Sequence, residues 1–152
     1  MKVCSFFGHS NCPNEIEEEL KQLIEKLIIS DGVTSFLVGD KGNFDNLVRK
    51  TLEGLSEHYD FQYQIVLAYM PYNKQGYQSV FAKDTNSVFP EELATVHKRY
   101  AIEYRNKYML DKADLVVTYI THNYGGAAKF ARKATLQKKR VINLAEKMPP
   151  ML

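Results

Sequence analysis

Three short glycine-rich turns stand out in the sequence, because each of them follows a run of apolar residues. They are Gly8-His9-Ser10, the segment from Gly39 to Asp45, and the segment from Asn123 to Ala127. Glycine lets the backbone approach a ligand closely, and a helix that begins at such a turn presents free N–H groups and the positive end of its dipole. Phosphate suits this arrangement. Together the turns predict a site for a phosphate-bearing ligand.

Arg105 is the most informative single residue. Ile102, Arg105 and Met109 have the spacing of one helical face, which sets the arginine between two apolar positions. Such an arginine either forms an ion pair in the core, with Asp45 or Asp111 as its partner, or makes a bidentate contact with a phosphate or carboxylate ligand. The pattern alone favours neither alternative.

Other candidate motifs give weaker indications. Cys4 and Cys12 are too few for a disulfide framework or a metal-ligand set, and a reactive thiol is conceivable only at Cys12, with His9 nearby. The sequence contains neither a G-x-x-x-x-G-K-[ST] loop nor a G-x-G-x-x-G turn after a strand, which disfavours a P-loop NTPase and an ordinary dinucleotide dehydrogenase. We therefore expect no metal and no cofactor.

The charge of the chain bears on its partners. The net charge is +2 at neutral pH, so the molecule has no strong positive field, and nucleic acid is not expected as a partner. The segment from Lys129 to Arg140 is basic, which is typical of a solvated helix face. Tyr100, Tyr104 and Tyr108 recur at every fourth position, which indicates a core or helix–helix contact rather than a base-stacking surface.

The segments that position these residues alternate between strand and helix patterns. Short apolar runs predict strands at Val3–Phe7, Thr34–Val38, Phe61–Tyr69, Asp114–Tyr119 and Arg140–Leu144. Helical patterns predict helices within Asn14–Asp31, Phe44–Leu55 and Gly126–Gln137. The segment Glu91–Asp111 predicts one long helix or two. This alternation is typical of βαβ units. We predict an α/β fold, a three-layer Rossmann-like, doubly wound, mostly parallel sheet of about five strands.

Length and composition bound the class of protein. The chain has 152 residues, of which 45% are hydrophobic and 25% charged, as in an ordinary globular protein. We expect a single domain over residues 1–152, with a functional or mobile loop from Met70 to Phe89 and a tail from Ala145 onward. No apolar run is long enough to span a membrane, and the first residues do not read as a signal peptide, so the expected location is cytoplasmic.

Five segments, taken together and in order, resemble the SLOG superfamily. They are FFGHS, VGDKGNFDNL, YRNKYMLDKADLVVTY, YGGAAKFARKA and KRVINL, and the likeness extends over nearly the whole chain, from Val3 to Leu144. This Rossmann-like group includes the Lonely Guy phosphoribohydrolases, the DNA-processing protein that loads recombinase, and nucleotide-ligand sensors in bacterial defence. The sequence is most similar to a largely uncharacterised bacterial and phage family within the group.

The resemblance implies a pocket for a nucleotide or an ADP-ribose-like ligand, in a protein that can form a homodimer. By their positions in the matching segments, the pocket residues would be Gly8, His9, Ser10, Gly39, Gly42, Phe44, Asp45, Arg105, Asn106, Gly125, Gly126 and Ala127. The family commonly has arginine where this chain has Ser10, and threonine where it has Ala127. One expected cation and one expected hydroxyl group are therefore missing.

The chain departs from the Lonely Guy enzymes where the chemistry would occur. Those enzymes pair an arginine, in the position of Arg105, with a glutamate just after the glycine-rich turn, whereas residues 127–132 here contain no carboxylate. Breaking an N-glycosidic bond needs a carboxylate that activates water or stabilises an oxocarbenium-like transition state. The missing carboxylate therefore favours binding over cleavage.

We accordingly predict binding or sensing of a nucleotide-derived small molecule at the carboxyl edge of the sheet. The ligand would be a nucleoside phosphate, NAD or an ADP-ribose-like molecule. The alternative is an N-glycosidic hydrolase that acts on nucleoside monophosphates, with Arg105 and Asp45 as its candidate catalytic residues.

Overall fold

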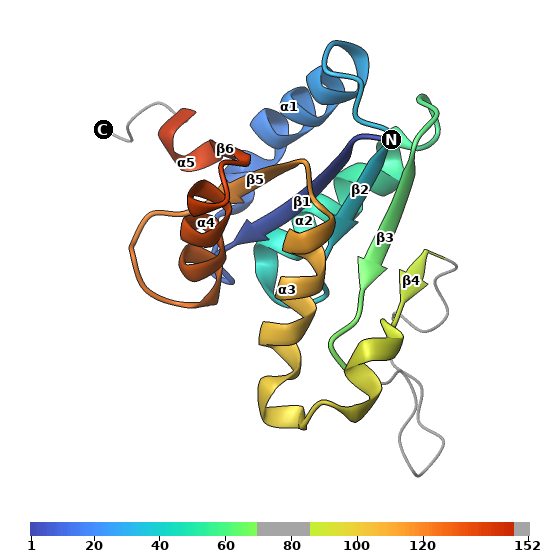
Figure 1. Ribbon diagram of the computed structural model, residues 1–152. Helices are drawn as coiled ribbons and strands as arrows, with labels where there is room; N and C mark the ends of the chain where they lie inside the picture. Colours follow the sequence, from blue (N-terminus) through green and yellow to red (C-terminus); the bar gives the residue numbers. More distant parts are fainter. Residues whose placement is uncertain (70–85, 148–152) are drawn as a thin grey trace.

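The computed structural model describes residues 1–69 and 86–147, and a parallel β-sheet forms its centre (Figure 1). The described strands are β1 (Val3–Gly8), β2 (Ser35–Val38), β3 (Gln62–Val66), β4 (Ser87–Val88), β5 (Leu115–Tyr119) and β6 (Arg140–Asn143). They lie in the order β4-β3-β2-β1-β5-β6, and each neighbouring pair is parallel. This order confirms the predicted doubly wound α/β fold.

The sheet has one strand more than predicted. The additional strand, β4, lies within the predicted loop from Met70 to Phe89, of which residues 70–85 are outside the described part of the chain. It consists of two residues that pair with the end of β3. So short a run has no periodicity that could identify it in a sequence.

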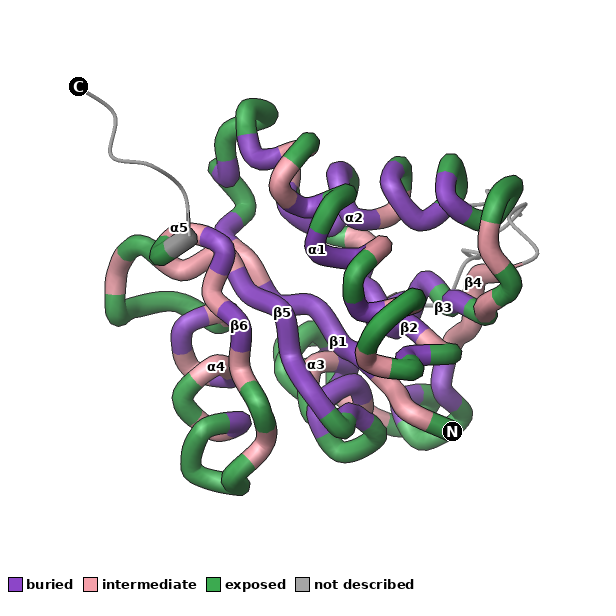
Figure 2. The backbone as a smooth tube through the Cα atoms, turned by 90° about the horizontal axis from the view of Figure 1, so that it is seen from above, coloured by how far each residue is buried: buried purple, intermediate pink, exposed green. Residues whose placement is uncertain are grey.

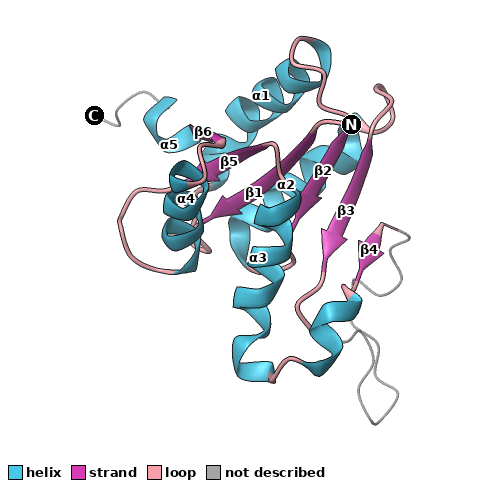
Figure 3. Ribbon diagram, in the orientation of Figure 1, coloured by secondary structure: helices cyan, strands magenta, loops and turns pink. Residues whose placement is uncertain are grey.

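Helices cover both faces of the sheet, which is the middle of three layers (Figure 3). On one face lie α1 (Glu17–Ile29) and α2 (Gly42–Leu55), and on the other lie α3 (Ala101–Lys112) and α4 (Gly126–Leu136). Shorter elements are the 3₁₀ turns η1 (Asn14–Ile16), η3 (Glu91–Thr95) and η4 (Lys98–Tyr100), and the helix α5 (Leu144–Lys147). No helix in the described ranges is both long and apolar enough to cross a membrane.

Successive residues of β1 point into two different cores. Cys4 and Phe6 pack with α1 and α2, whereas Phe7 packs with α3 and α4 and stacks on Phe130 with 5.7 Å between the ring centroids. Ser5 is also buried, and its hydroxyl donates a 2.8 Å hydrogen bond to a main-chain carbonyl of α3. Buried residues run along the strands in Figure 2, and exposed ones cover the outer sides of the helices. Because both faces of β1 are covered, its sequence is apolar without alternation.

The segment from Glu91 to Asp111, predicted as one long helix or two, is α-helical only in its second half. In the first half the chain forms the turns η3 and η4, and α3 begins only after them. His97 precedes η4, and its Nδ1 atom accepts a 3.0 Å hydrogen bond from the main-chain N–H of Arg99. A side chain that bonds nearby backbone in this way competes with a continuous helix. The tyrosine stripe is split by this break, and Tyr100 and Tyr104 are exposed instead of lying in the core.

Candidate functional site

A cavity of about 460 Å³ lies at the carboxyl ends of β1 and β5, the neighbouring strands at which the strand order reverses. The turns after β1, β2 and β5 and one side of α3 form its walls. The predicted pocket residues that line it are Gly8, His9, Ser10, Gly39, Asp45, Arg105, Asn106, Gly125, Gly126 and Ala127. A cavity of this size is in the range of small-molecule sites. The fold thus gathers residues that are far apart in the sequence.

Two predicted pocket residues, Gly42 and Phe44, do not line the cavity. Phe44 is fully buried beneath Gly8, where a Cβ atom on the glycine would lie 2.2 Å from Cγ of the ring. Gly42 has a φ of +88°, and a Cβ atom there would lie 2.7 Å from Cα of Ser10. We therefore correct the role of Gly42 and Phe44 from ligand contact to support of the two turns.

Arg105 lines the cavity but is only 3% exposed. Its Nη1 atom donates hydrogen bonds to Oδ1 of Asp40 at 2.9 Å and to the last main-chain carbonyl of β3 at 3.0 Å. Its Nε atom donates to Oδ1 of Asn106 at 2.9 Å. The core ion pair is therefore present, but the partner is Asp40 and not Asp45 or Asp111. These bonds fix the guanidinium, and none of the bonds to the described residues involves Nη2.

Asp45 is a second buried carboxyl group beside the same arginine. Its Oδ2 atom accepts a 3.1 Å hydrogen bond from the main-chain N–H of Lys41. Oδ2 and Nη1 of Arg105 both lie against Gly39, where a Cβ atom would be 2.6 Å from each. Burial raises the pKa of Asp45 to about 7, although the charge of Arg105 and the bond from Lys41 oppose this. One guanidinium thus faces the carboxyl groups of Asp40 and Asp45.

We expect Asp45 to make the protein less stable as the pH rises from about 4 to about 7. The pKa of an aspartate in an unfolded chain is about 3.9, whereas burial raises the pKa of Asp45 to about 7 in the fold. Below this window both states are protonated and the stabilisation is complete. Within the window only the folded state holds the proton, so the free energy of unfolding falls as the pH rises.

Urea unfolding of the wild type and of Asp45→Asn across this pH range measures the effect. The asparagine cannot ionise, so the stability of the variant relative to the wild type should rise steadily over the window. A constant difference between the two proteins would mean that Asp45 is ionised throughout and would contradict the raised pKa.

Three aromatic rings stack at the edge of the cavity, formed by His9, His122 and Tyr124. The centroid of the His122 ring lies 3.7 Å from that of His9 and 3.7 Å from that of Tyr124. The Nε2 atom of His9 accepts a 3.0 Å hydrogen bond from the main-chain N–H of Thr121. Burial and the neighbouring His122 lower the pKa of His9, which keeps its ring neutral and able to accept this bond. Tyr124, at the outer end of the stack, is 68% exposed.

The amino terminus of α4 opens onto the cavity through Gly125 and Gly126. Gly125 is the N-cap residue, has a φ of +92° and provides no side chain to cap the helix. A Cβ atom on either glycine would have no described residue within 4 Å, apart from its chain neighbours and its own helix, so the space in front of the helix is open on this part of the chain. The first N–H groups of a helix lack partners within it, and the first turn of α4 contains no acidic residue. This end of α4 therefore suits an anion.

The described part of the chain has no reactive thiol and no metal-ligand cluster near this cavity. Cys12 is buried, and burial raises the pKa of its thiol to about 12, so the reactive thiolate does not form near neutral pH. Cys4 is fully buried in the core. No group of three or more His, Cys, Asp or Glu side chains among the described residues is arranged to hold a metal ion.

Known structures share the fold, although no protein-family model and no curated protein matches the sequence. DNA processing protein A from Helicobacter pylori superposes with a TM-score of 0.64 and 12% identity, over 99% of this chain and 66% of that one. DNA processing protein A from Streptococcus pneumoniae superposes with a TM-score of 0.65 and 11% sequence identity, over 93% of this chain and 49% of that one. The molybdenum cofactor carrier protein from Chlamydomonas reinhardtii superposes with a TM-score of 0.57 and 12% sequence identity, over 93% of this chain and 75% of that one.

These comparisons correct the expectation about nucleic acid. The low net charge argues against nucleic acid as a partner, but the Helicobacter pylori protein of the same fold has a single-stranded DNA binding mode. Net charge averages over the whole surface and does not exclude a local nucleic-acid site. This chain spans 66% and 49% of the length of the two DNA processing proteins. At sequence identities of 12% and 11%, the likeness shows a shared fold and not a shared function. The chain has the Rossmann-like fold of the DNA processing proteins, which supports the resemblance to the SLOG superfamily at the level of fold.

Proposed function

We propose that the cavity at the carboxyl edge of the sheet binds a nucleotide-derived small molecule, such as a nucleoside phosphate, NAD or an ADP-ribose-like ligand. The observation that carries this proposal is the exposed ring of Tyr124 beside the uncapped amino terminus of α4. An exposed aromatic face can stack on a base, and the N–H groups at the start of a helix can bind phosphate. A nucleotide contains both groups and can use both features at once.

The neighbouring residues would complete such a site. Gly125 and Gly126 leave open space in front of the helix, so phosphate oxygens could approach the main chain. Arg105 is held from behind by Asp40 and would supply a positive charge that is already oriented. Asn106, which also lines the cavity, fixes the guanidinium through Nε. The ligand would therefore meet a site with little left to reorganise.

Gly126→Val is expected to weaken the binding of AMP, NAD or ADP-ribose at least about tenfold. The branched side chain would occupy the open space in front of α4. Since no atom of the described residues outside α4 and the chain neighbours lies within 4 Å of the new Cβ, the fold should tolerate the change. Isothermal titration calorimetry measures the affinity, and the unfolding temperature of the free variant checks the fold.

The matched control is Gly54→Val, the same change at an open helical position of α2 that does not line the cavity. This control should bind like the wild type. An affinity of Gly126→Val equal to that of the wild type would mean that the ligand does not approach this turn.

A second candidate ligand is single-stranded nucleic acid, which a row of rings and cations along the same edge favours. Besides Tyr124, the ring of Tyr69 follows β3, and the ammonium groups of Lys41 and Lys98 lie 5.2 Å and 5.9 Å from its centroid. Bases stack on exposed rings, and lysines follow a phosphate backbone. The shared fold of the DNA processing proteins also supports this candidate.

Fluorescence anisotropy with labelled oligo-dT, at increasing salt, separates the two candidates. Binding that falls steeply with salt and is lost in Tyr124→Ala would support a nucleic-acid ligand. Binding of AMP or ADP-ribose without retention of oligo-dT at physiological salt would support a small-molecule site.

The hydrolase alternative depends on Asp45. It lines the cavity, and burial raises its pKa to about 7, which lets the carboxyl group exchange a proton near neutral pH. Incubation with AMP and NAD, followed by chromatography for the free base, tests this alternative. Base release that disappears in Asp45→Asn would support a hydrolase, whereas saturable binding without release supports a binding protein.

A further inference from the structure

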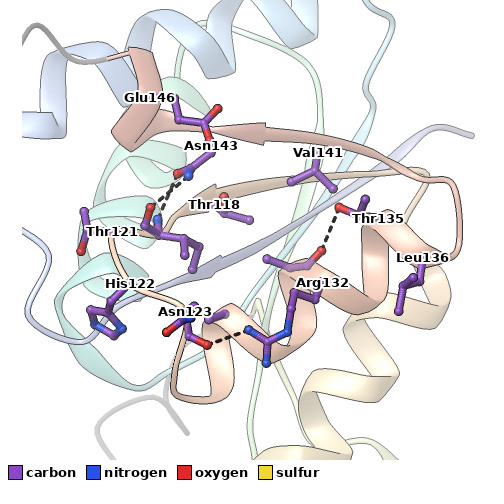
Figure 4. Close-up of a pocket in the computed structure, with 13 residues that line it drawn as sticks. Thr118, Thr121, His122, Asn123, Arg132, Thr135, Leu136, Val141, Asn143 and Glu146 are labelled. Atoms are coloured by element: carbon purple, nitrogen blue, oxygen red, sulfur yellow. Dashed lines mark hydrogen bonds between the residues drawn. The ribbon is translucent and has the colours of Figure 1, made fainter.

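A second cavity, of about 770 Å³, lies between α4, β6 and the loop that follows β5 (Figure 4). Its walls carry aliphatic side chains, among them Ile120, Ala131 and Val141. Within the described residues, the two cavities have one lining residue in common, His122. The second cavity is therefore a separate space, and the proposed function leaves it without a role.

Thr118 lines this second cavity and is fully buried. Its Oγ1 atom is the one buried side-chain N or O atom among the described residues that lacks a hydrogen-bond partner. Ser5, on the adjacent strand β1, is equally buried, but its hydroxyl donates a 2.8 Å hydrogen bond to the carbonyl of Met109. Buried hydroxyls normally have partners. An unpartnered one beside a cavity marks a position where a ligand atom can complete the bond.

Two opposite charges lie at opposite ends of the second cavity, with Thr118 between them in the view of Figure 4. Arg132 belongs to α4, and its Nη1 atom donates a 2.7 Å hydrogen bond to the carbonyl of Asn123. Glu146 belongs to α5. Neither side chain forms a salt bridge with another residue in the described ranges. The cavity therefore offers one positive and one negative group that a ligand can pair with.

We propose that this cavity binds a small zwitterion whose two charges are several bonds apart, namely a short aliphatic peptide with free termini. Its carboxylate would pair with Arg132, because a planar guanidinium matches a carboxylate. Its ammonium group would pair with Glu146, and a carbonyl between the two ends would accept a hydrogen bond from Thr118. Its side chains would pack on Ile120 and Val141. This proposal does not depend on nucleotide binding in the first cavity.

Calorimetric titration of the whole protein with trialanine tests the proposal. We expect saturable binding that weakens at least about tenfold when the peptide is N-acetylated, and likewise when it is C-amidated. Arg132→Gln lacks the partner of the peptide carboxylate, so it should bind the free and the amidated peptide equally. Glu146→Gln lacks the partner of the peptide ammonium group, so it should bind the free and the acetylated peptide equally. Lys26→Gln removes one positive charge from α1, on the opposite face of the sheet, and should bind like the wild type.

Two results of this titration would overturn the proposal. The first is the absence of saturable heat with trialanine. The second is a pair of variants, Arg132→Gln and Glu146→Gln, that still distinguish the free from the capped peptides as the wild type does.

Thr118→Val provides an independent test of the hydroxyl group. Valine has nearly the same shape, so the variant should unfold at the same or a higher temperature, since it removes an unpartnered buried hydroxyl. It should also bind trialanine at least about tenfold more weakly than the wild type. A lower unfolding temperature, or unchanged affinity for trialanine, would overturn the role proposed for Thr118.

Discussion

Arg105→Met is expected to lower the free energy of unfolding by about 3–5 kcal/mol. Methionine would fill much of the same space, but it would leave the carboxylate of Asp40, whose side chain is 8% exposed, without the Nη1 donor at 2.9 Å. Removing the close partner of a buried charge destabilises a fold strongly. The ammonium group of Lys41, 3.9 Å from Oδ2 of Asp40, is about half exposed and replaces the guanidinium only weakly. Urea denaturation at neutral pH measures the loss.

Lys107→Met is the matched control, because it removes a cation from the same helix. Lys107 pairs with Asp111 at 2.9 Å, but the two side chains are 64% and 51% exposed, so water screens the pair and the change in stability should be far smaller. The double variant Arg105→Met with Asp40→Asn should regain much of the lost stability, since it also removes the buried charge of Asp40. If Arg105→Met proves as stable as the wild type, the guanidinium is not a core ion-pair partner.

Gly8→Ala is expected to lower the free energy of unfolding by about 1–3 kcal/mol. The new Cβ atom would lie 2.2 Å from Cγ of Phe44. The Phe44 ring is fully buried and lies 6.4 Å, between centroids, from the ring of Phe6. A ring surrounded by close-packed side chains cannot move aside without disturbing them. Thermal or urea unfolding measures the loss.

Two further variants serve as controls for Gly8→Ala. Gly54→Ala places a methyl group in open space on α2 and should leave the stability unchanged or raise it by up to about 1 kcal/mol, because alanine favours helix. Gly8→Ala combined with Phe44→Leu should cost less than the sum of the two single changes, since the smaller side chain relieves the overlap. Strictly additive losses would contradict a direct clash between Gly8 and Phe44.

The central strands could be predicted because both of their faces are covered. The runs Val3–Phe7 and Asp114–Tyr119 are almost entirely apolar, and the observed strands β1 and β5 start or end within one residue of them. The strand β4 and the turns η3 and η4 could not be predicted in the same way. β4 depends on pairing with β3, and η4 depends on one hydrogen bond from Arg99 to His97, so neither leaves a periodic pattern.

The candidate site could be predicted as far as it follows from topology. The glycine turns meet because the carboxyl ends of parallel strands share one edge of the sheet. The partner of Arg105 could not be predicted, since the choice among Asp40, Asp45 and Asp111 depends on how two loops pack. The stack of His9, His122 and Tyr124 could not be predicted either, because it depends on side-chain packing. The position of His122 and Tyr124 directly after β5 indicated only that both lie near the carboxyl edge of the sheet.

The loop after β5 has a consequence for how the two cavities would work together. Its residue His122 lines both of them, and the same ring is the middle member of the stack between His9 and Tyr124. A ligand that displaces this ring on entering one cavity must alter the shape of the other. Thermodynamic reciprocity then requires each ligand to change the affinity of the other by the same factor. A protein with such a shared wall would couple the binding of two different ligands.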